Sequence, residues 1–330
     1  MKRDNFLRVL AGCVLAALTL LILATPPAYP QSDYPNRPIR ILVGFAPGGG
    51  NDIFARLVGA KVSEILGQPV VIENKPGGSG RLAAEFAARQ APDGYTLMVA
   101  PSGAMSVAAA IYPDLAYRPL ESFVPLAMTA IYPLIVTVSA NHPAKTIKEL
   151  VEFGKQHPDK ANYASVSPSF TIATELFKLN TGLPGVMIPY KSSNEMILSL
   201  MNGQAMYTVV DGPVTIPQVQ AGTVRALAVT GSEPLPELPN VPTMAAIGYP
   251  EVDSHLWSGV FAIAGTSPAI IAKLQKAINE AIRDPAVSEK LRNMAVTPGG
   301  GPPDEFRSLI AAEIIKYTKI VKAANLHFEE

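Results

Sequence analysis

The segment FAPGGGNDIFAR, residues 45–56, places three consecutive glycines between an apolar run and a helical pattern. The run Ile39–Phe45 predicts a buried strand, and Asn51–Leu66 predicts a helix whose apolar side chains share one face. A glycine loop between a strand and a helix N-terminus can present backbone N–H groups to an anion. The segment therefore leaves two alternatives: an anion-binding loop, or a tight turn that binds nothing.

The best-known phosphate-binding patterns fit this loop poorly. A P-loop requires a Gly-Lys-Ser/Thr ending, which the chain lacks here. The dinucleotide pattern G-x-G-x-x-G fits Gly48 and Gly50 but finds isoleucine in the third place, although Glu73 could act as the ribose-binding acid. Asp52, in the first turn of the helix, disfavours a polyanion and is interpreted as a helix-start residue. The loop suits one small group such as a carboxylate.

The N-terminus has the pattern of a secretory signal peptide. Three basic residues precede the apolar run Val9–Leu23, and small residues follow it, so we expect cleavage near Ala28. A retained anchor is the alternative, but the run is short for a span of ~20 residues. Lipidation at Cys13 is a second alternative, although most of the apolar run follows that cysteine. Because Cys13 is the only cysteine, cleavage would leave no thiol or disulfide chemistry.

The composition excludes some classes of function. With 330 residues, 48% of them hydrophobic, the chain can bury a large core and is long for one domain. Its formal net charge of zero provides no basic footprint for nucleic acid. The four histidines are scattered, and no nucleophile or carboxylate pair has catalytic spacing. We therefore expect no catalysis, no metal and no cofactor.

Strands and helices alternate after the signal segment, which predicts an α/β fold with parallel strands covered by helices on both faces. A predicted strand at 255–262 is followed by three helices that begin near Pro268, Pro285 and Pro303. Helices without strands of their own must pack on an existing sheet. We therefore expect residues 29–131 plus 255–330 to form one lobe and residues 132–254 the other, with a ligand cleft between them.

Two polar segments of the second lobe are candidate contacts. Ser165, Ser167 and Ser169 follow a predicted strand and precede a helix, where hydroxyls can cap the helix or bind an anion. Asp211 ends an apolar strand before Gly212-Pro213 and is interpreted as a helix cap. Its alternative role is to accept a hydrogen bond from an amine or hydroxyl of a ligand. Trp257, the only tryptophan, is expected in the core.

Seven segments occur in this order: YPNRPIRILVGFAPGGGND, LGQPVVIENKPGGSG, APDGYTL, PYKSSNEMILSLMNGQ, AGTVRALAVTGSE, LPNVPTMAAIGYP and WSGVFAIAGTSP. Together they resemble the Bug-type extracytoplasmic solute receptors of tripartite tricarboxylate transporters. The resemblance spans the mature chain. The resemblance implies a two-lobed type II periplasmic binding fold that closes on a small organic acid. The implied ligands are di- and tricarboxylates, acidic amino acids and aromatic acids. In the family the first strand-to-helix loop and the serine-rich loop embrace a carboxylate, and here those loops are Phe45–Asp52 and Ser165–Thr171. From these loops the candidate ligand contacts are Phe45, Pro47, Gly48, Gly49, Gly50, Asn51, Ser165, Ser167, Ser169, Phe170 and Thr171, and we add Ser102 and Asp211 as further candidates.

The chain departs from the family pattern at two places. Its second-lobe loop is short and contains Pro168, where the family commonly has a longer glycine-rich loop with a histidine. Arg81 stands where the family often has asparagine, and it could pair with a second carboxylate of the ligand or lie in solvent. The resemblance implies a monomer in the periplasm that delivers its ligand to a membrane permease. Presentation of the ligand to a sensor kinase and a secreted α/β enzyme are the alternatives.

Overall fold

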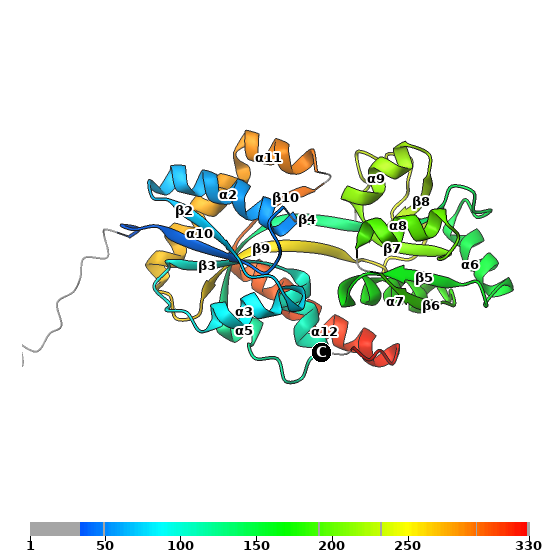
Figure 1. Cartoon of the computed structure of the whole chain (residues 1–330), viewed down its shortest axis with the longest axis horizontal. Coiled ribbons are helices and arrows are strands. Elements are labelled where there is room, and N and C mark those ends of the chain that lie inside the picture. The colour runs from blue at the N-terminus through cyan, green and yellow to red at the C-terminus, as the bar shows by residue number, and fades with distance from the viewer. Residues whose placement is uncertain (1–33, 49, 191, 232, 295, 329–330) are drawn as a thin grey trace, which may run out of the picture. The chain divides into compact units, whose positions relative to one another are not determined.

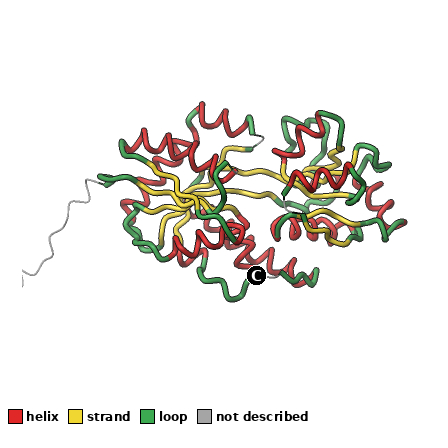
Figure 2. The backbone as a smooth tube through the Cα atoms, in the orientation of Figure 1, coloured by secondary structure: helices red, strands yellow, loops and turns green. Residues whose placement is uncertain are grey.

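The structure, a computed structural model, describes residues 34–48, 50–190, 192–231, 233–294 and 296–328. Residues 1–36 and 37–330 are two separate units, and the fold below is that of the second unit. It consists of two α/β lobes, each with a sheet between helices (Figures 1 and 2). The expected signal peptide, its cleavage near Ala28 and the alternative of lipidation at Cys13 lie outside the described residues.

The sheet of lobe 1 mixes parallel and antiparallel strands. Its order is β2-β1-β3-β9-β4, with β10 also paired to β4. Strand β1 is parallel to β2 and β3, whereas β9 is antiparallel to both β3 and β4. The strands are β1 Ile39–Val43, β2 Val70–Asn74, β3 Thr96–Pro101, β4 Phe123–Ser139, β9 His255–Ile263 and β10 Thr297–Gly300.

The sheet of lobe 2 continues from β4 through β7, β5 and β6, and β8 also pairs with β4. Strand β5 is parallel to β6 and β7, but β4 is antiparallel to β7 and β8. These strands are β5 Asn162–Ser165, β6 Val186–Pro189, β7 Tyr207–Asp211 and β8 Val224–Val229. The expectation of purely parallel pairing was therefore wrong, because strands that carry the chain between lobes run against their neighbours.

Two long strands connect the lobes. Residues Phe123–Pro133 of β4 pair with β9, and residues Leu134–Ser139 pair with β7 and β8. The 17-residue β4 was not expected from the sequence, since prolines interrupt its pattern. We propose that the boundary between the lobes lies at this change of partners, near the crossings expected at 131 and 255.

Helices cover both sheets, and most of their starts follow from local sequence. The hydroxyls of Thr146 and Ser192 accept backbone N–H groups of α6 and α8, as their capping patterns predict. The helices of lobe 1 are α2 Gly50–Leu66, α3 Arg81–Ala88, α4 Ala108–Ile111, α5 Pro119–Ser122, α10 Pro268–Arg283, α11 Pro285–Arg292 and α12 Pro303–Ala323, with short turns η2 Gly78–Gly80 and η3 Gly103–Val107. Those of lobe 2 are α6 Ile147–Gln156, α7 Pro168–Thr181, α8 Ser193–Met201, α9 Gly212–Gln220 and η4 Ala245–Ile247.

Each lobe has its own core. In lobe 1 Trp257 is fully buried and its ring meets that of Phe306 edge-on, which confirms its expected core position. In lobe 2 the rings of Tyr163 and Phe177 pack near Tyr207. A smaller apolar cluster brings the two lobes together, because it joins α12 and η3 of lobe 1 to α7 of lobe 2: Val107, Ile172, Leu176, Tyr317 and Ile320.

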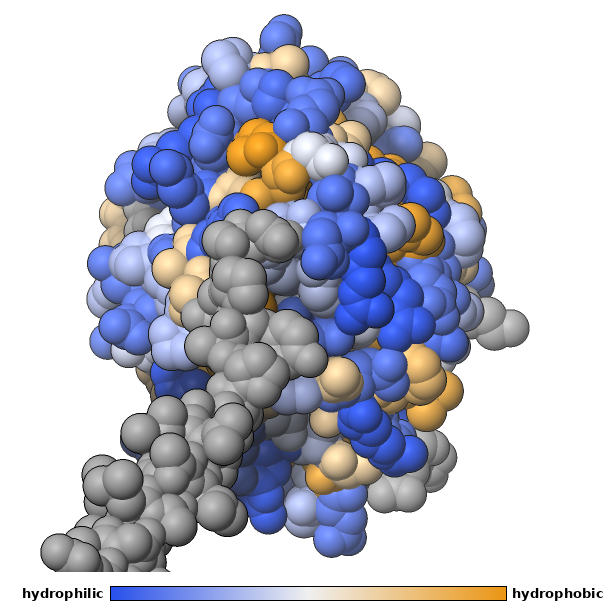
Figure 3. All heavy atoms as spheres, turned by 90° about the vertical axis from the view of Figure 1, so that its left-hand side faces the viewer, coloured by the Kyte–Doolittle hydropathy of each residue, from blue (hydrophilic) through white to orange (hydrophobic). Residues whose placement is uncertain are grey.

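The face in Figure 3 is mostly hydrophilic, with hydrophobic residues in small separate groups. Within the described part of the chain, no helix is both long and apolar enough to cross a membrane.

Candidate ligand site between the two lobes

The candidate site lies where strands of both lobes give way to helical turns. Strands β1 and β3 of lobe 1 lead into α2 and η3, and strands β5 and β7 of lobe 2 lead into α7 and α9. The first N–H groups of an α-helix have no partner within the helix, so such helix starts can bind an anion. The arrangement places polar backbone from both lobes at one junction.

Asp52 organises the glycine loop. Its Oδ2 accepts hydrogen bonds from the backbone N–H of Gly48 at 2.8 Å and from Nε of Arg56 at 2.9 Å. Its Oδ1 accepts from Nδ2 of Asn74 at 2.8 Å, and the same nitrogen also donates to the Phe45 carbonyl. The Arg56 hydrogen bond, above all, lowers the pKa of Asp52 to about 2 despite its burial. Asp52 therefore holds the loop from within and is committed to the protein, in agreement with its interpretation as a helix-start residue.

The glycines of the loop have different roles. Gly48 has a φ of +84°, a conformation that side chains rarely adopt, so this position requires glycine. Gly50 has no such φ, and a Cβ there would lie 3.7 Å from the Phe54 ring, an ordinary contact. Gly49 lies outside the described residues. Pro47, Gly48 and Gly50 are exposed, whereas Phe45 is half-buried with its ring beside Gly80.

Asn51 and Ser102, at the starts of α2 and η3, lie near a residue that no sequence pattern marked. The hydroxyl of Ser258, on β9, donates to Oδ1 of Asn51 at 2.7 Å. Ser258 is the register partner of Pro101, so it lies next to the strand end that carries Ser102. The Ser102 hydroxyl is buried and has no hydrogen-bond partner among the described residues. No local pattern marked Ser258, because its role arises from the pairing of β9 with β3.

A second glycine loop, residues 77–80, packs against the first. All four residues have positive φ, including Ser79 at +53°, a conformation that non-glycine residues adopt infrequently. A Cβ on Gly44 would lie only 2.5 Å from the Cα of Gly80, so the two loops touch backbone to backbone. Arg81 follows this loop, half-buried, with its guanidinium 3.9 Å from the centre of the Tyr112 ring and its Nε donating to the Gly78 carbonyl.

The serine-rich loop of lobe 2 is braced internally. The hydroxyls of Ser165 and Thr171 are 2.8 Å apart, and the Thr171 hydroxyl donates to the Ser167 carbonyl. Ser167 is the N-cap residue of α7, but its side chain makes no capping hydrogen bond. Phe170 packs into the core of lobe 2. The loop therefore holds its shape through Ser165 and Thr171 and leaves the side chains of Ser167 and Ser169 uncommitted to a cap.

A cavity of about 90 Å³ connects the two lobes at this loop. Ser169 approaches Gly103 so closely that a Cβ on the glycine would lie 2.9 Å from its hydroxyl. The polar and glycine residues that line the cavity come from η2, α3, η3 and the end of α4 in lobe 1 and from the serine loop of lobe 2: Gly78, Ser79, Arg81, Gly103, Tyr112, Ser167 and Ser169.

Asp211 is not the helix cap that its position suggested. It is the N-cap residue of α9, but its side chain makes no capping hydrogen bond. Its Oδ1 is buried without a hydrogen-bond partner among the described residues. Burial raises the pKa of this carboxyl group, although the Ser193 hydroxyl and the backbone of Asp211 itself oppose the shift. The interpretation as a helix cap is therefore wrong: the carboxylate is bound by Ser193 and by its own backbone, and Oδ1 alone has no partner among the described residues.

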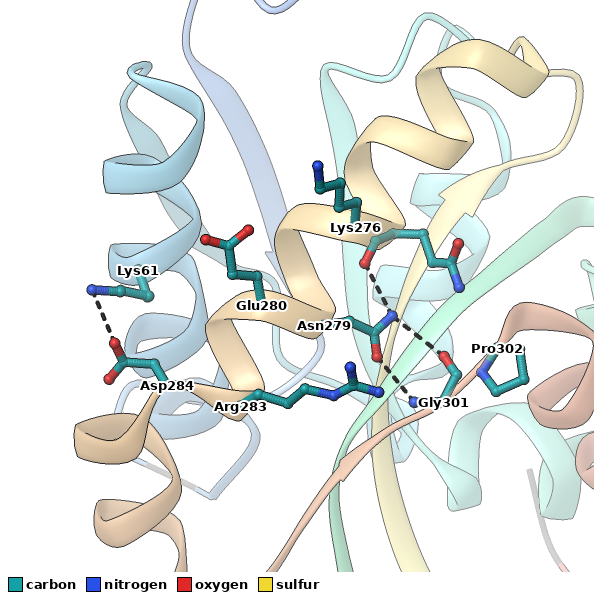
Figure 4. Close-up of a pocket in the computed structure, with 9 residues that line it drawn as sticks. Lys61, Lys276, Asn279, Glu280, Arg283, Asp284, Gly301 and Pro302 are labelled. Atoms are coloured by element: carbon teal, nitrogen blue, oxygen red, sulfur yellow. Dashed lines mark hydrogen bonds and ion pairs between the residues drawn. The ribbon is translucent and has the colours of Figure 1, made fainter.

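A larger hollow, of about 830 Å³, lies on lobe 1 alone (Figure 4). It is bordered by α2, α10 and the turn before α12. Its polar groups are largely paired within the protein: Lys61 binds Asp284, and the Asn279 side chain both donates to and accepts from the backbone of Gly301. No group of three or more potential metal ligands occurs among the described residues. A ligand held by both lobes requires the junction instead.

The fold is that of a two-lobed periplasmic binding protein, and the comparisons with known proteins give the family. The model of the tripartite tricarboxylate transporter family receptor matches residues 54–326. The chain belongs to this family. It is 35% identical to BugT of Bordetella pertussis over 314 residues, which cover 94% of this chain and 96% of BugT.

Two solved structures of similar receptors contain carboxylates. Rpa4515 of R. palustris, solved with adipate, is 32% identical with a TM-score of 0.78, and the match covers 89% of this chain and 99% of that one. MatC (Rpa3494) from Rhodopseudomonas palustris, with bound malate, is 31% identical with a TM-score of 0.75, covering 87% and 100%. Proteins of this family are substrate-binding receptors and not enzymes.

Proposed function

We propose that this chain is a periplasmic receptor that captures a small organic carboxylate by closing its two lobes and delivers it to a membrane permease. The observation that carries the proposal is the junction itself, where a cavity is lined by Arg81 of lobe 1 and the serine loop of lobe 2. Similar receptors hold adipate and malate, which are small carboxylates. A ligand that contacts both lobes stabilises the closed state, because only that state presents both surfaces at once.

In this proposal the first loop and the serine loop share the ligand carboxylate. The α2 helix start, with Gly50 and Asn51, supplies backbone N–H groups and the Asn51 side-chain NH₂. Ser258 occupies the Asn51 oxygen, which orients the amide nitrogen as a donor. Ser102, with its unpartnered hydroxyl, contributes from the start of η3. Phe45, Pro47 and Gly48 border this loop and complete its contact surface.

The serine loop closes the site from the other lobe. Ser167 and Ser169 donate hydroxyl hydrogen bonds, while Ser165, Phe170 and Thr171 hold the loop in place. Arg81 lies at the edge of the cavity and can form paired hydrogen bonds with a second carboxylate. The guanidinium stacks on the Tyr112 ring, which also lines the cavity, and this contact restricts its position. Asp211 forms part of the same junction from α9.

Cleavage of the signal segment near Ala28 would release the receptor into the periplasm, where the receptors of this family act. The intact mass of the protein from a periplasmic extract tests this step. A mature chain that begins at an acylated Cys13 would contradict it.

Ligand released from the purified protein by denaturation and identified by mass spectrometry tests the proposed function directly. We expect a small carboxylate, bound one per chain and recovered chemically unchanged after incubation with the receptor. Calorimetric titration of the stripped protein with that compound should restore binding. Recovery of a converted product would instead favour the secreted-enzyme alternative. Uptake of the compound by cells should stop when the receptor is deleted, and unchanged uptake with a lost transcriptional response would favour a sensor kinase as partner.

A further inference from the structure

An apolar contact joins the two lobes beside the cavity. Figure 1 shows the end of α12, from lobe 1, reaching α7 of lobe 2, and the two helices are in contact there. The side chains of this contact come from three elements, and each is at most 7% exposed. We call them the interlobe cluster: Val107 of η3, Tyr317 and Ile320 of α12, and Ile172 and Leu176 of α7.

The helix α7 has two apolar faces. Phe170, Ala173 and Phe177 pack in the core of lobe 2. Ile172 and Leu176 instead pack against α12 and η3 in the interlobe cluster. A helix that covers a sheet from outside needs one apolar face only, with polar residues opposite. The second apolar face of α7 is therefore accounted for by its contact with lobe 1.

The helix α12 belongs to lobe 1 along most of its length. Phe306 and Ile310 lie in the core of that lobe. Glu313 accepts a hydrogen bond from the indole Nε1 of Trp257, on β9, at 2.9 Å. Beyond these anchors the helix continues to Tyr317 and Ile320, which reach lobe 2. The interlobe cluster is thus a contact between two separately anchored helices.

The residues after α12 cover the interlobe cluster. Asn325 has a φ of +49°, and the backbone N–H of Leu326 donates to the Val321 carbonyl at 3.0 Å. This turn ends the helix and directs the chain back, so that the half-buried Leu326 and Phe328 pack against the cluster. The contact is therefore shielded from water on this side.

The interlobe cluster borders the cavity of the candidate site. Val107 belongs to the cluster and also lines the cavity. Ser169 lines the cavity from lobe 2, and Ile172 follows it by three residues on the same side of α7. A motion that opens the cavity therefore moves α7 away from η3 and exposes apolar side chains of the cluster to water. Such exposure is unfavourable, so the cluster opposes opening.

We infer that the interlobe cluster holds the lobes partly closed in the absence of ligand and thereby strengthens ligand binding without touching the ligand. The measured dissociation constant equals the intrinsic constant divided by the fraction of receptor in the closed, binding-competent state. Loss of the cluster lowers that fraction and raises the measured constant. The effect on affinity rests on the proposed function, whereas the state of the stripped receptor can be measured without any ligand.

Two variants remove apolar side chains from opposite sides of the contact, Leu176→Ala in lobe 2 and Ile320→Ala in lobe 1. Small-angle scattering of each stripped variant should give a larger radius of gyration than the stripped parent. Succinate, malate and adipate serve as probes in calorimetric titration. Each probe that binds the parent should bind the variants about three- to tenfold more weakly.

Matched controls separate this effect from a general loss of packing. Ile310→Ala changes the same helix as Ile320→Ala but inside the core of lobe 1, and Leu200→Ala changes the core of lobe 2. Both controls should lower the melting temperature and keep the radius of gyration and probe affinity of the parent. If an alanine variant of the cluster fails to fold, Leu176→Val and Ile320→Val test the same contact with a smaller loss.

The outcomes distinguish this inference from the proposed function. Cluster variants with the radius of gyration of the stripped parent overturn the inference and leave the carboxylate receptor intact. Tighter probe binding by these variants also overturns it, because the cluster would then hold the lobes open. If no probe binds the parent and no carboxylate co-purifies, the proposed function fails, and the scattering of the stripped proteins still decides whether the cluster holds the lobes together.

Discussion

The carboxylate of Asp52 and the backbone N–H of Gly48 are joined by a 2.8 Å hydrogen bond that closes the glycine loop onto the first turn of its own helix. The acid is 2% exposed and also binds Arg56 and Asn74. An acid in a loop proposed to bind an anion is unexpected on charge alone. Here its negative charge is matched by Arg56 and by the N-terminal end of the helix dipole, so that it shapes the loop without opposing the ligand.

The hydrogen bonds that Asp52 accepts, above all the one from Arg56 and then the one from Gly48, make the stability of the protein depend on acid pH. Its pKa is about 2 in the folded protein against an ordinary 3.8. The stabilisation is present above pH 3.8 and is lost as the pH falls through about 2. Asp52→Asn should lower the free energy of unfolding at pH 6 by about 1–2 kcal/mol. This loss is smaller than a buried ion pair would give, because solvent screens the half-exposed Arg56. Urea unfolding of both proteins between pH 2 and 6 should give curves that converge at the acid end. A constant gap across that range would contradict the assignment.

The close contact between the two glycine loops predicts unequal effects of two alanine substitutions. Gly44→Ala places a Cβ 2.5 Å from the Cα of Gly80, and neither backbone can yield easily. We expect a loss of about 1–3 kcal/mol in the free energy of unfolding, together with weaker ligand binding as the loops separate. Gly50→Ala meets only the Phe54 ring at 3.7 Å and should change stability by less than about 1 kcal/mol. Equal tolerance of both substitutions, measured by urea unfolding, would show that the loops do not depend on each other.

The buried pair of Trp257 and Glu313 predicts an opposite pH dependence. The indole Nε1 donates to Oε2 of Glu313 at 2.9 Å, and burial raises the pKa of this carboxyl group. An acid with a raised folded-state pKa contributes stability below its ordinary pKa of 4.5 and loses it as the pH rises through the folded value. Glu313→Gln should therefore gain stability relative to the parent between pH 4.5 and 8. Thermal unfolding across this range measures the difference, and parallel pH profiles would argue against a shifted Glu313.

Closure of the lobes should be visible in solution. Strands β4 and β9 are the two connections between the lobes within the described body, which permits a hinge motion about them. Small-angle scattering of the stripped receptor should show a smaller radius of gyration once the co-purified carboxylate is added. Choline, a cation without a carboxylate, serves as the control and should leave the scattering unchanged. Tight binding of the carboxylate with no change in the radius of gyration would exclude closure as the capture mechanism.

Local sequence determined much of the architecture. The glycine at 48 is required by its own positive φ, and the caps at Thr146 and Ser192 act on N–H groups three residues away. The apolar periodicity of a helix and a proline in its first turn are also signals between residues close in sequence. The positions of α2, α10 and α11 could therefore be predicted to within a few residues. The serine loop was recognisable as a strand-to-helix turn for the same reason.

Only the tertiary structure decided which polar groups meet. Ser258 binds Asn51 across 207 residues of sequence. Strand β4 passes through Pro125 and Pro133 in the part that pairs with β9, and it then continues with β7 and β8 as partners. Asp211 stands at a helix start, as its sequence suggested, yet its side chain does not cap the helix. Whether a polar side chain turns back to its own helix or toward a ligand depends on the groups that packing brings within hydrogen-bond distance. That proximity is set by long-range strand pairing, which local sequence does not encode.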